Sequence, residues 1–225
     1  MIPLRDDQPR ATFPFATILI IAINAAVFFF WQLQIGLDKS VSLAGFVPLE
    51  LTTHQSGGST HLITSMFMHA GWMHIIGNMW FLWIFGSNVE DDCGHFRFLS
   101  FYLLCGATAT LAYTYFSPDS RIPLVGASGA ISGVLGAYLL HHPQARILTL
   151  MPFGVFTRLM EIPAWVFLLI WIGMQIFYQA LAVQAHGQHG GVAYAAHIGG
   201  FVAGLGLIYF FEKGPGTRQR ISSAR

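Results

Sequence analysis

The sequence predicts an all-α, polytopic membrane protein built as a bundle of six transmembrane helices. The first observation is composition: 54% of the 225 residues are hydrophobic and only 9% are Asp, Glu, Lys or Arg. Soluble domains carry about 25% charged residues, so this chain could not cover a soluble surface of its size. The net charge is +1 and no basic run is present, which argues against nucleic acid as a partner.

The second observation is the spacing of the charged residues, which leaves long stretches without Asp, Glu, Lys or Arg. These stretches are residues 11–37, 51–89, 98–118, 122–145 and 162–211. A membrane span needs about 20 apolar residues, so the last stretch is too long for one helix. The polar, glycine-rich run at 184–191 divides it in two. The predicted helices are 14–36, 70–89, 96–116, 124–142, 163–183 and 192–211.

These helices are predicted to form one membrane domain over residues 14–211, between an N-terminal tail at 1–13 and a C-terminal tail at 212–225. Two long connections, 37–69 and 143–162, contain prolines and scattered polar residues and are predicted to be loops. The two cysteines show no metal-ligand spacing, and neither a metal nor another cofactor is expected.

The distribution of Lys and Arg predicts how the helices are oriented. With the N-terminus inside, nine basic residues fall on the cytoplasmic side and only Lys39 and Arg121 on the other. Both termini are therefore expected in the cytoplasm, and the second, fourth and sixth helices are expected to run from outside to inside. The compact chain, without a targeting extension, favours a bacterial inner membrane.

Polar side chains inside membrane spans are costly and are candidates for function. In the second predicted helix, His74 and Asn78 are four residues apart and share one face, while His69 precedes them. Taken alone, this group is also typical of interfacial histidines and of an asparagine that bonds to a neighbouring helix.

A second group surrounds Ser128, near the start of the fourth predicted helix. Gly126 and Gly129 flank this serine in a Gly-x-Ser-Gly run. Small residues of this kind also form packing faces between membrane helices, so the motif alone does not establish a nucleophile.

The third group begins with His197 in the sixth predicted helix, where Gly200 and Gly204 follow at i+3 and i+7 on the same face. Such a face lets a partner helix approach closely. His74, Ser128 and His197 each lie four to six residues into an inward-running helix, within roughly 6–10 Å of the outer surface. Their common depth predicts that the three side chains meet.

Together these residues suit nucleophilic chemistry. A serine becomes a useful nucleophile when an imidazole base lies beside it, as His197 would beside Ser128. His74 and Asn78 could then donate to an oxyanion, with the Ser128 N–H as a third donor. No Asp or Glu lies within these spans, so the predicted arrangement is a Ser-His dyad and not a triad.

At these residues the chain resembles the rhomboid family of intramembrane serine proteases, over about residues 14–211. The matching motifs are His69-x4-His74-x3-Asn78, Gly126-Ala127-Ser128-Gly129 and Ala196-His197-Ile198-Gly199-Gly200. The resemblance implies a six-helix bundle that cleaves membrane-protein substrates in or near a transmembrane segment, close to the extracytoplasmic side. It also implies that the protein works within the lipid bilayer without a metal or a cofactor.

The resemblance further assigns roles to individual residues. It implies that Ser128 is the nucleophile and His197 the general base and acid. It implies an oxyanion site made by His74, Asn78 and the Ser128 amide. Glu90, which follows the second predicted helix, matches a glutamate that family members use to hold helix ends and loops together.

The chain departs from the family pattern at two places. Many members carry a Trp-Arg pair in the first external loop, where this chain has Thr60-His61. Some members have an aromatic residue one turn after the nucleophile, stacked on the histidine, where this chain has Ser132. The second departure leaves the support of the His197 ring without an assigned residue.

Three other functions fit parts of the sequence. His69, His74 and His197 could cluster, and two of them could ligate zinc, although a catalytic zinc site usually adds a third ligand or a carboxylate. A non-catalytic relative could bind membrane clients, although such proteins typically lose the serine or the histidine. A transporter would be expected to show an inverted repeat and buried acidic residues, and the sequence shows neither.

Overall fold

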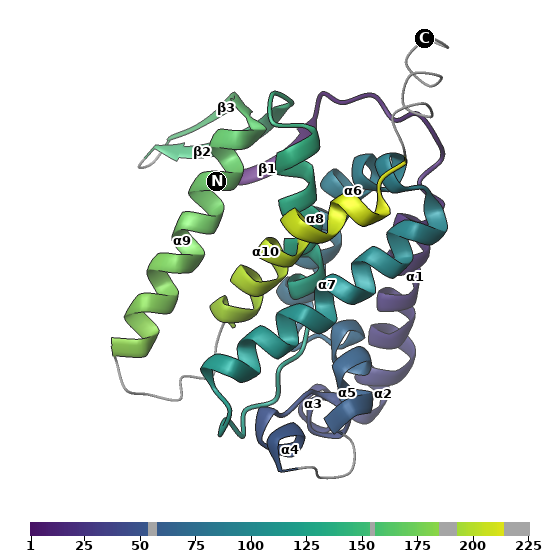
Figure 1. The fold of residues 1–225 in the computed structure, drawn as a ribbon, viewed down its shortest axis with the longest axis vertical. Helices are drawn as coiled ribbons and strands as arrows, with labels where there is room; N and C mark the ends of the chain where they lie inside the picture. Colours follow the sequence, from purple (N-terminus) through teal and green to yellow (C-terminus); the bar gives the residue numbers. More distant parts are fainter. Residues whose placement is uncertain (54–57, 154–155, 185–192, 214–225) are drawn as a thin grey trace.

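Long apolar helices dominate the computed structural model, which describes residues 1–53, 58–153, 156–184 and 193–213 (Figure 1). Among these described residues, four helices are long and apolar enough to cross a membrane. They cover Phe15–Ile35, His95–Phe116, Ala164–Val183 and Tyr194–Phe211. Apart from Gln184, which ends a helix, the predicted glycine-rich turn at 184–191 lies outside the described residues, as does most of the predicted C-terminal tail.

The helices occupy the six predicted positions with shifted ends. The first consists of α1 (Phe15–Val27), a π-helical turn η1 (Phe28–Gln32) and α2 (Leu33–Ile35). The others are α6 (Trp72–Cys93), α7 (His95–Phe116), α8 (Ser128–His141), α9 (Ala164–Gln184) and α10 (Tyr194–Phe211). With 14 residues, α8 is roughly 21 Å long, shorter than the ~30 Å hydrocarbon core of a bilayer. The number of membrane spans therefore stays a prediction.

Two glycines explain where helix ends differ from the prediction. Gly126 has φ +121°, a conformation that a helix cannot contain, so α8 begins at Ser128 and not at 124. Gly94 has φ +86° and separates α6 from α7. The acidic residues 90–92, which were expected beyond the second helix, lie inside α6.

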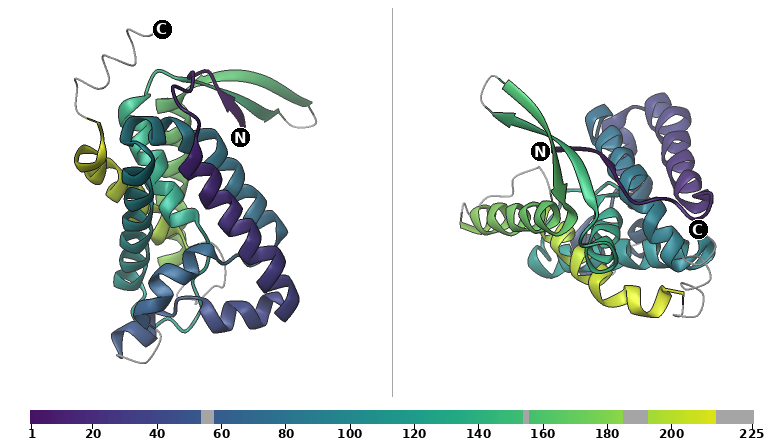
Figure 2. Two further views of the ribbon diagram at one scale, coloured as in Figure 1. Left: turned by 90° about the vertical axis from the view of Figure 1, so that its right-hand side faces the viewer. Right: turned by 90° about the horizontal axis from the view of Figure 1, so that it is seen from above.

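The first connection is largely helical and not a loop. It contains the short helices α3 (Leu37–Ala44), α4 (Pro48–Thr52), α5 (Gly58–Thr64) and the 3-10 turn η2 (Ser65–Phe67). A bridge between Phe46 and Leu124 ties this segment to the chain before α8. These short helices lie at one end of the bundle in both views of the side of the molecule (Figures 1 and 2).

The opposite end carries a small sheet, so the prediction of an all-α fold is wrong in this detail. Strands β1 (Ile2–Asp6), β2 (Arg146–Phe153) and β3 (Phe156–Pro163) form an antiparallel sheet in that order. The second predicted loop is thus a β-hairpin, and the N-terminal tail adds a strand to it. The pairing of β1 with β2 joins residues far apart in the sequence, which local patterns do not report.

Helix α8 packs against four of the other long helices, α6, α7, α9 and α10. Residues 130–138 of α8 are all buried. Its closest neighbour is α10: a Cβ atom on Gly200 would overlap the backbone oxygen of Gly129, and one on Gly204 would overlap that of Gly133. This is the close approach that the glycines of the two helices predict.

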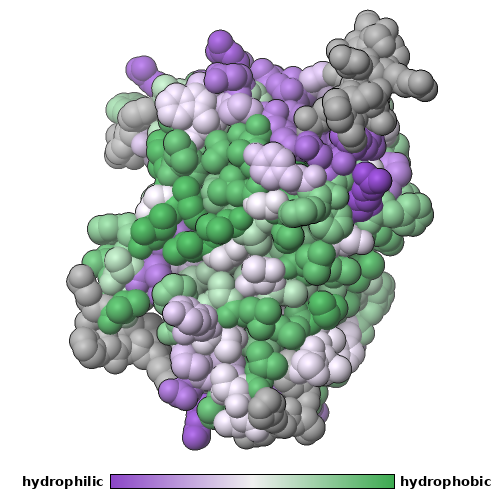
Figure 3. All heavy atoms as spheres, in the orientation of Figure 1, coloured by the Kyte–Doolittle hydropathy of each residue, from purple (hydrophilic) through white to green (hydrophobic). Residues whose placement is uncertain are grey.

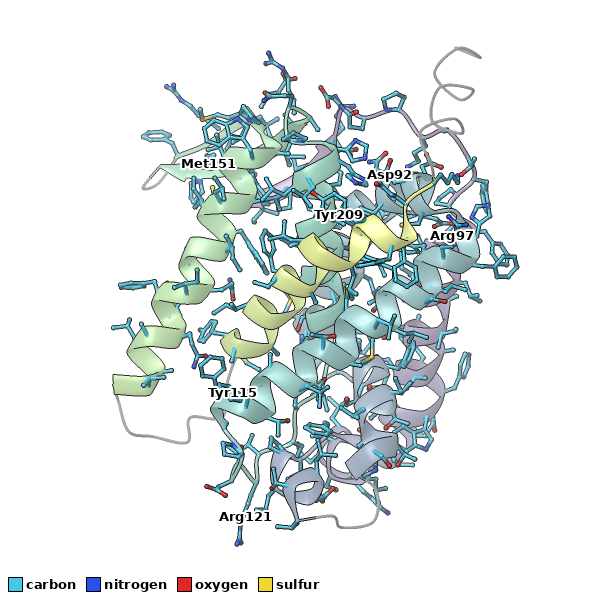
Figure 4. The ribbon with its side chains drawn as sticks, viewed as in Figure 1. Asp92, Arg97, Tyr115, Arg121, Met151 and Tyr209 are labelled. Atoms are coloured by element: carbon cyan, nitrogen blue, oxygen red, sulfur yellow. The ribbon has the colours of Figure 1, made fainter. Side chains whose placement is uncertain are left out.

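The outer surface has the pattern of a membrane protein. Apolar side chains gather across the middle of the face in Figure 3, with hydrophilic residues toward both ends. Large apolar side chains such as Phe30 and Phe210 are each 81% exposed, which suits contact with lipid. Asp92 and Arg97 lie toward one end and Arg121 at the other (Figure 4).

The close approach of α8 and α10 makes a test of the fold possible. Gly204→Ala should lower the free energy of unfolding by about 1–3 kcal/mol, because the new methyl group has no space beside Gly133. Thermal unfolding of the purified protein in detergent measures this. Gly206→Ala in the same helix is the control, since a Cβ there meets nothing within 4 Å. Equal stability of the two variants would contradict the packing described.

Candidate active site

Ser128 and His197 are hydrogen-bonded to each other, with 2.8 Å between Ser128 Oγ and His197 Nε2. Ser128 is the first residue of α8 and His197 the fourth of α10. The glycine contacts between the two helices bring the side chains within this distance. His74 is the third residue of α6, so all three predicted residues lie in the first turns of their helices.

Gly126 makes room for the His74 ring beside Ser128. A Cβ atom at Gly126 would lie 2.7 Å from His74 Nε2 and 3.7 Å from Ser128 Oγ. The two polar atoms therefore face the same small space. The Gly126 N–H donates to the Ser65 carbonyl at 2.9 Å, which anchors this turn to the first connection.

His74 and Asn78 present hydrogen-bond donors on one face of α6. His74 Nδ1 accepts from the Ala70 backbone N–H at 3.3 Å, so the hydrogen of the neutral ring belongs on Nε2, toward Gly126. Asn78 Nδ2 donates to the His74 carbonyl at 2.8 Å. An amide NH₂ carries two hydrogens, so a second one remains for a ligand.

His69 packs edge to face against the His74 ring inside the protein. It is fully buried, and the centre of its ring lies 5.1 Å from that of His74. Gln32 holds its backbone from both sides: Gln32 Oε1 accepts from the His69 N–H and Gln32 Nε2 donates to the His69 carbonyl, each at 2.9 Å. Gln32 belongs to the π-helical turn, a feature often found at functional sites. Nothing in the sequence pattern predicted this contact of Gln32.

A cavity of about 210 Å³ opens in front of Ser128. Its lining comes from three helices and is mostly apolar. The lining residues are Met73, His74, Gly77, Asn78, Phe81, Ser128, Ile131, Ser132, Leu135 and Trp171. The serine and the two donors of α6 therefore face one common space, which is large enough for part of a side chain and for water.

The other side of His197 faces α9, a helix without a predicted site residue. Gln175 Oε1 lies 2.9 Å from His197 Nδ1. The ring of Trp171 packs against the imidazole with centroids 5.9 Å apart and an angle of 32° between the planes. Gln175 could have been noticed, because it is a polar residue in the middle of a charge-free predicted span.

Glu90 joins three helices at the end of the bundle that carries the sheet. Its carboxylate is fully buried and accepts from the N–H groups of Ala16 at 2.8 Å and Thr17 at 2.7 Å, in the first turn of α1. It also contacts His95 Nδ1 of α7 at 2.5 Å. A carboxylate at a helix N-terminus satisfies free donors and favours the helix dipole.

The three histidines considered for a metal do not form a ligand set. His197 Nε2 and Nδ1 are engaged with Ser128 and Gln175, and His69 packs against His74 edge to face. Within the described residues, no three His, Cys, Asp or Glu side chains are grouped so that they could hold a metal ion.

The chain matches the family described as the Rhomboid domain over residues 56–213. It is similar to Rhomboid protease GluP of Bacillus subtilis, with 37% identity over 126 residues that cover 56% of this chain and 24% of the relative. It is 29% identical to Rhomboid-like protein 11, chloroplastic, of Arabidopsis thaliana, over 83% of this chain and 66% of the relative. It is also 29% identical to Rhomboid protein 1, mitochondrial, of Saccharomyces cerevisiae, over 86% of this chain and 52% of the relative.

The chain thus spans between about a quarter and two thirds of the length of these curated relatives. Their names place one in chloroplasts and one in mitochondria, while another comes from a bacterium. These names do not support the predicted bacterial inner membrane. The apolar helices indicate an integral membrane protein without specifying the membrane.

The contacts of Glu90 generate a prediction about stability. Glu90→Ala should lower the free energy of unfolding by about 2–3 kcal/mol, because two N–H groups of α1 lose their buried acceptor. Denaturation in detergent measures the change. Glu161→Ala is the control, since Glu161 is exposed and pairs with Arg146 at 3.6 Å, a contact worth about 0–1 kcal/mol. A loss no larger than that of the control would exclude a capping role for Glu90.

Proposed function

Because the chain belongs to the rhomboid family, whose members are generally intramembrane serine proteases although some are inactive, we propose that it is a serine endopeptidase that cleaves membrane-protein substrates. The observation that carries the proposal is the 2.8 Å hydrogen bond between Ser128 Oγ and His197 Nε2, beside a cavity that Ser128 lines. A relative without activity would not need this pair.

In this proposal Ser128 is the nucleophile and His197 the base. His197 Nε2 removes the proton from Ser128 Oγ as the oxygen attacks the carbonyl carbon of the scissile peptide bond. A tetrahedral intermediate forms with a negative charge on the former carbonyl oxygen. His197 then gives the proton to the leaving amine, the C–N bond breaks, and Ser128 holds the acyl group as an ester.

Three donors would stabilise the oxyanion. They are His74 Nε2–H, the second hydrogen of the Asn78 amide, and the backbone N–H of Ser128 at the start of α8, where a helix has free N–H groups. Water then attacks the ester carbon while His197 takes its proton. The bond to Ser128 Oγ breaks, His197 returns the proton to Oγ, and the acid is released. The cavity in front of Ser128 gives this water a place.

The proposed substrates are proteins with a transmembrane segment, cleaved near the extracytoplasmic side of the bilayer. The proposed topology has six spans with both termini in the cytoplasm. The nine-to-two distribution of Lys and Arg supports it. Contacts near both ends of the described chain also support it. The Ala11 N–H donates to the side chain of Asp91, and Lys213 Nζ donates to the Asp91 carbonyl, so both segments lie on the same side of the bundle.

The proposed dyad predicts the behaviour of two variants. Ser128→Ala and His197→Ala should each lower cleavage of a single-span substrate by at least about 10³-fold, with unfolding temperatures close to that of the unchanged protein. Cleavage by the purified proteins in detergent measures this. Ser100→Ala, an exposed serine on α7, is the control. Turnover near the unchanged level in Ser128→Ala would remove the proposed function.

The substrate should need a weak helix at the cleavage site. A helical backbone hides its carbonyls in hydrogen bonds, so the scissile bond must be extended before Ser128 can reach it. Replacing Gly or Pro near the cleavage site of a model substrate with Leu should slow cleavage, because helix breaking by these residues is lost. The same replacement at the far end of the span should have little effect. Equal rates for all substrates would contradict this requirement.

A further inference from the structure

We infer that helix α9 positions the imidazole of His197, through Gln175, in the role that an acid fills in a Ser-His-Asp triad. The inference rests on the proposed function, because it concerns the base of that reaction. The charge-free stretch 162–211, which contains His197, has no Asp or Glu that could orient the ring. A dyad without any orienting group would leave the base free to turn away from the serine.

The hydrogen bond at Nδ1 determines which ring nitrogen can act as base. A neutral imidazole has one N–H and one acceptor nitrogen. Gln175 Oε1 can only accept, so the 2.9 Å contact places the hydrogen on His197 Nδ1. His197 Nε2 is then the acceptor and takes the Ser128 hydroxyl proton at 2.8 Å. This is the tautomer that a general base needs.

The orientation of the Gln175 amide is itself set by a second contact. Gln175 Nε2 donates to the Trp171 carbonyl one turn earlier in α9, at 3.4 Å, which leaves Oε1 toward the histidine. The side chain is only 8% exposed, so water competes little for the carbonyl oxygen. An amide buried in a membrane helix needs such partners, and the histidine supplies one.

The same helix also supports the plane of the ring. Trp171 packs on His197 with centroids 5.9 Å apart, within the range of aromatic pairs. Ser132 lies at the position where some family members have an aromatic residue. Its hydroxyl donates to the Ser128 carbonyl at 2.7 Å. Trp171 thus provides from α9 the aromatic contact that α8 lacks.

Helix α9, which carries both Gln175 and Trp171, is the least buried of the four apolar helices. Only 17% of the apolar segment of α9 is buried, whereas 33–39% is buried in the other three apolar helices. Helix α9 lies at the side of the bundle (Figure 1). The tautomer and the plane of His197 therefore depend on the least buried of these four helices. Any displacement of α9 would withdraw both Gln175 and Trp171 from the base.

Two substitutions of Gln175 and a control at Met174 test the inference in the whole 225-residue chain. Gln175→Leu removes the acceptor at similar size, and kcat for a single-span substrate should fall about 10–100-fold with KM little changed, a part of the 10²–10⁴-fold that a general base contributes. Gln175→Glu keeps an acceptor and should restore most of kcat. Met174→Leu, on the exposed side of α9, is the control and should match the unchanged protein.

The pH profile separates positioning from simple packing. A carboxylate next to Nδ1 stabilises the protonated ring, so the acidic limb of the Gln175→Glu profile should move to higher pH by about 1 unit or more. A packing role would leave the limb where it is. An unmoved limb, or a Gln175→Leu variant within twofold of the unchanged kcat, would overturn the inference.

A direct measurement keeps the inference separate from the proposed function. In ¹⁵N-histidine spectra, the signals lost in His197→Ala identify this ring, and they should show the hydrogen on Nδ1 in the unchanged protein and a mixture of tautomers in Gln175→Leu. This result needs no catalysis. The hydrogen on Nε2 in the unchanged protein would overturn the role of Gln175, whereas full activity of Ser128→Ala would overturn only the proposed function.

Discussion

The arrangement of the site depends on the close backbone contact between α8 and α10. Gly129 and Gly133 on one helix meet Gly200 and Gly204 on the other, with no space for a Cβ atom at Gly200 or Gly204. In a bilayer, helices gain nothing from burying apolar surface against each other, so close packing of small residues is a main source of association. Side chains of ordinary size at these positions would separate the helices and the two groups of the dyad.

The remaining parts of the site are attached to this pair by short polar contacts. Gly126 turns the chain into α8 with a backbone conformation suited to glycine and leaves room for the ring of His74. Gln32 fixes the segment just before α6 by bonding both backbone groups of His69. At the far end, Glu90 ties the first turn of α1 to α6 and α7. Each contact satisfies backbone or ring groups that a membrane interior would otherwise leave without partners.

Helix α9 differs from the others in how it joins the bundle. It contributes a glutamine and a tryptophan to the histidine of the dyad, yet most of its surface is directed away from the protein. The proposed site therefore combines a nucleophile, held in place by the α8–α10 contact, with a base whose orientation depends on a more peripheral helix. In the proposed mechanism, cleavage of a substrate therefore depends on how α9 packs against the bundle.

The sequence by itself determined the membrane class, the approximate positions of the long helices and the candidate residues of the site. Charge-free stretches of sufficient length have few other solutions, because a buried charge in lipid is costly. The spacing of the glycines also indicated which helix faces meet, since only small residues permit such an approach. The ends of the helices were less well predicted, as the start of α8 shows, because a positive φ at Gly126 is not visible in composition.

The tertiary structure decided what depends on contacts between distant segments. The strand pairing of the N-terminal tail with 146–153, the clamp of Gln32 on His69, and the bond from His197 to Gln175 all join residues that no local period relates. A polar residue in a span can be flagged from the sequence, but its partner is selected by how the helices rotate and pack. The physical reason is that helix periodicity determines which residues share a face, whereas packing between helices determines what that face meets.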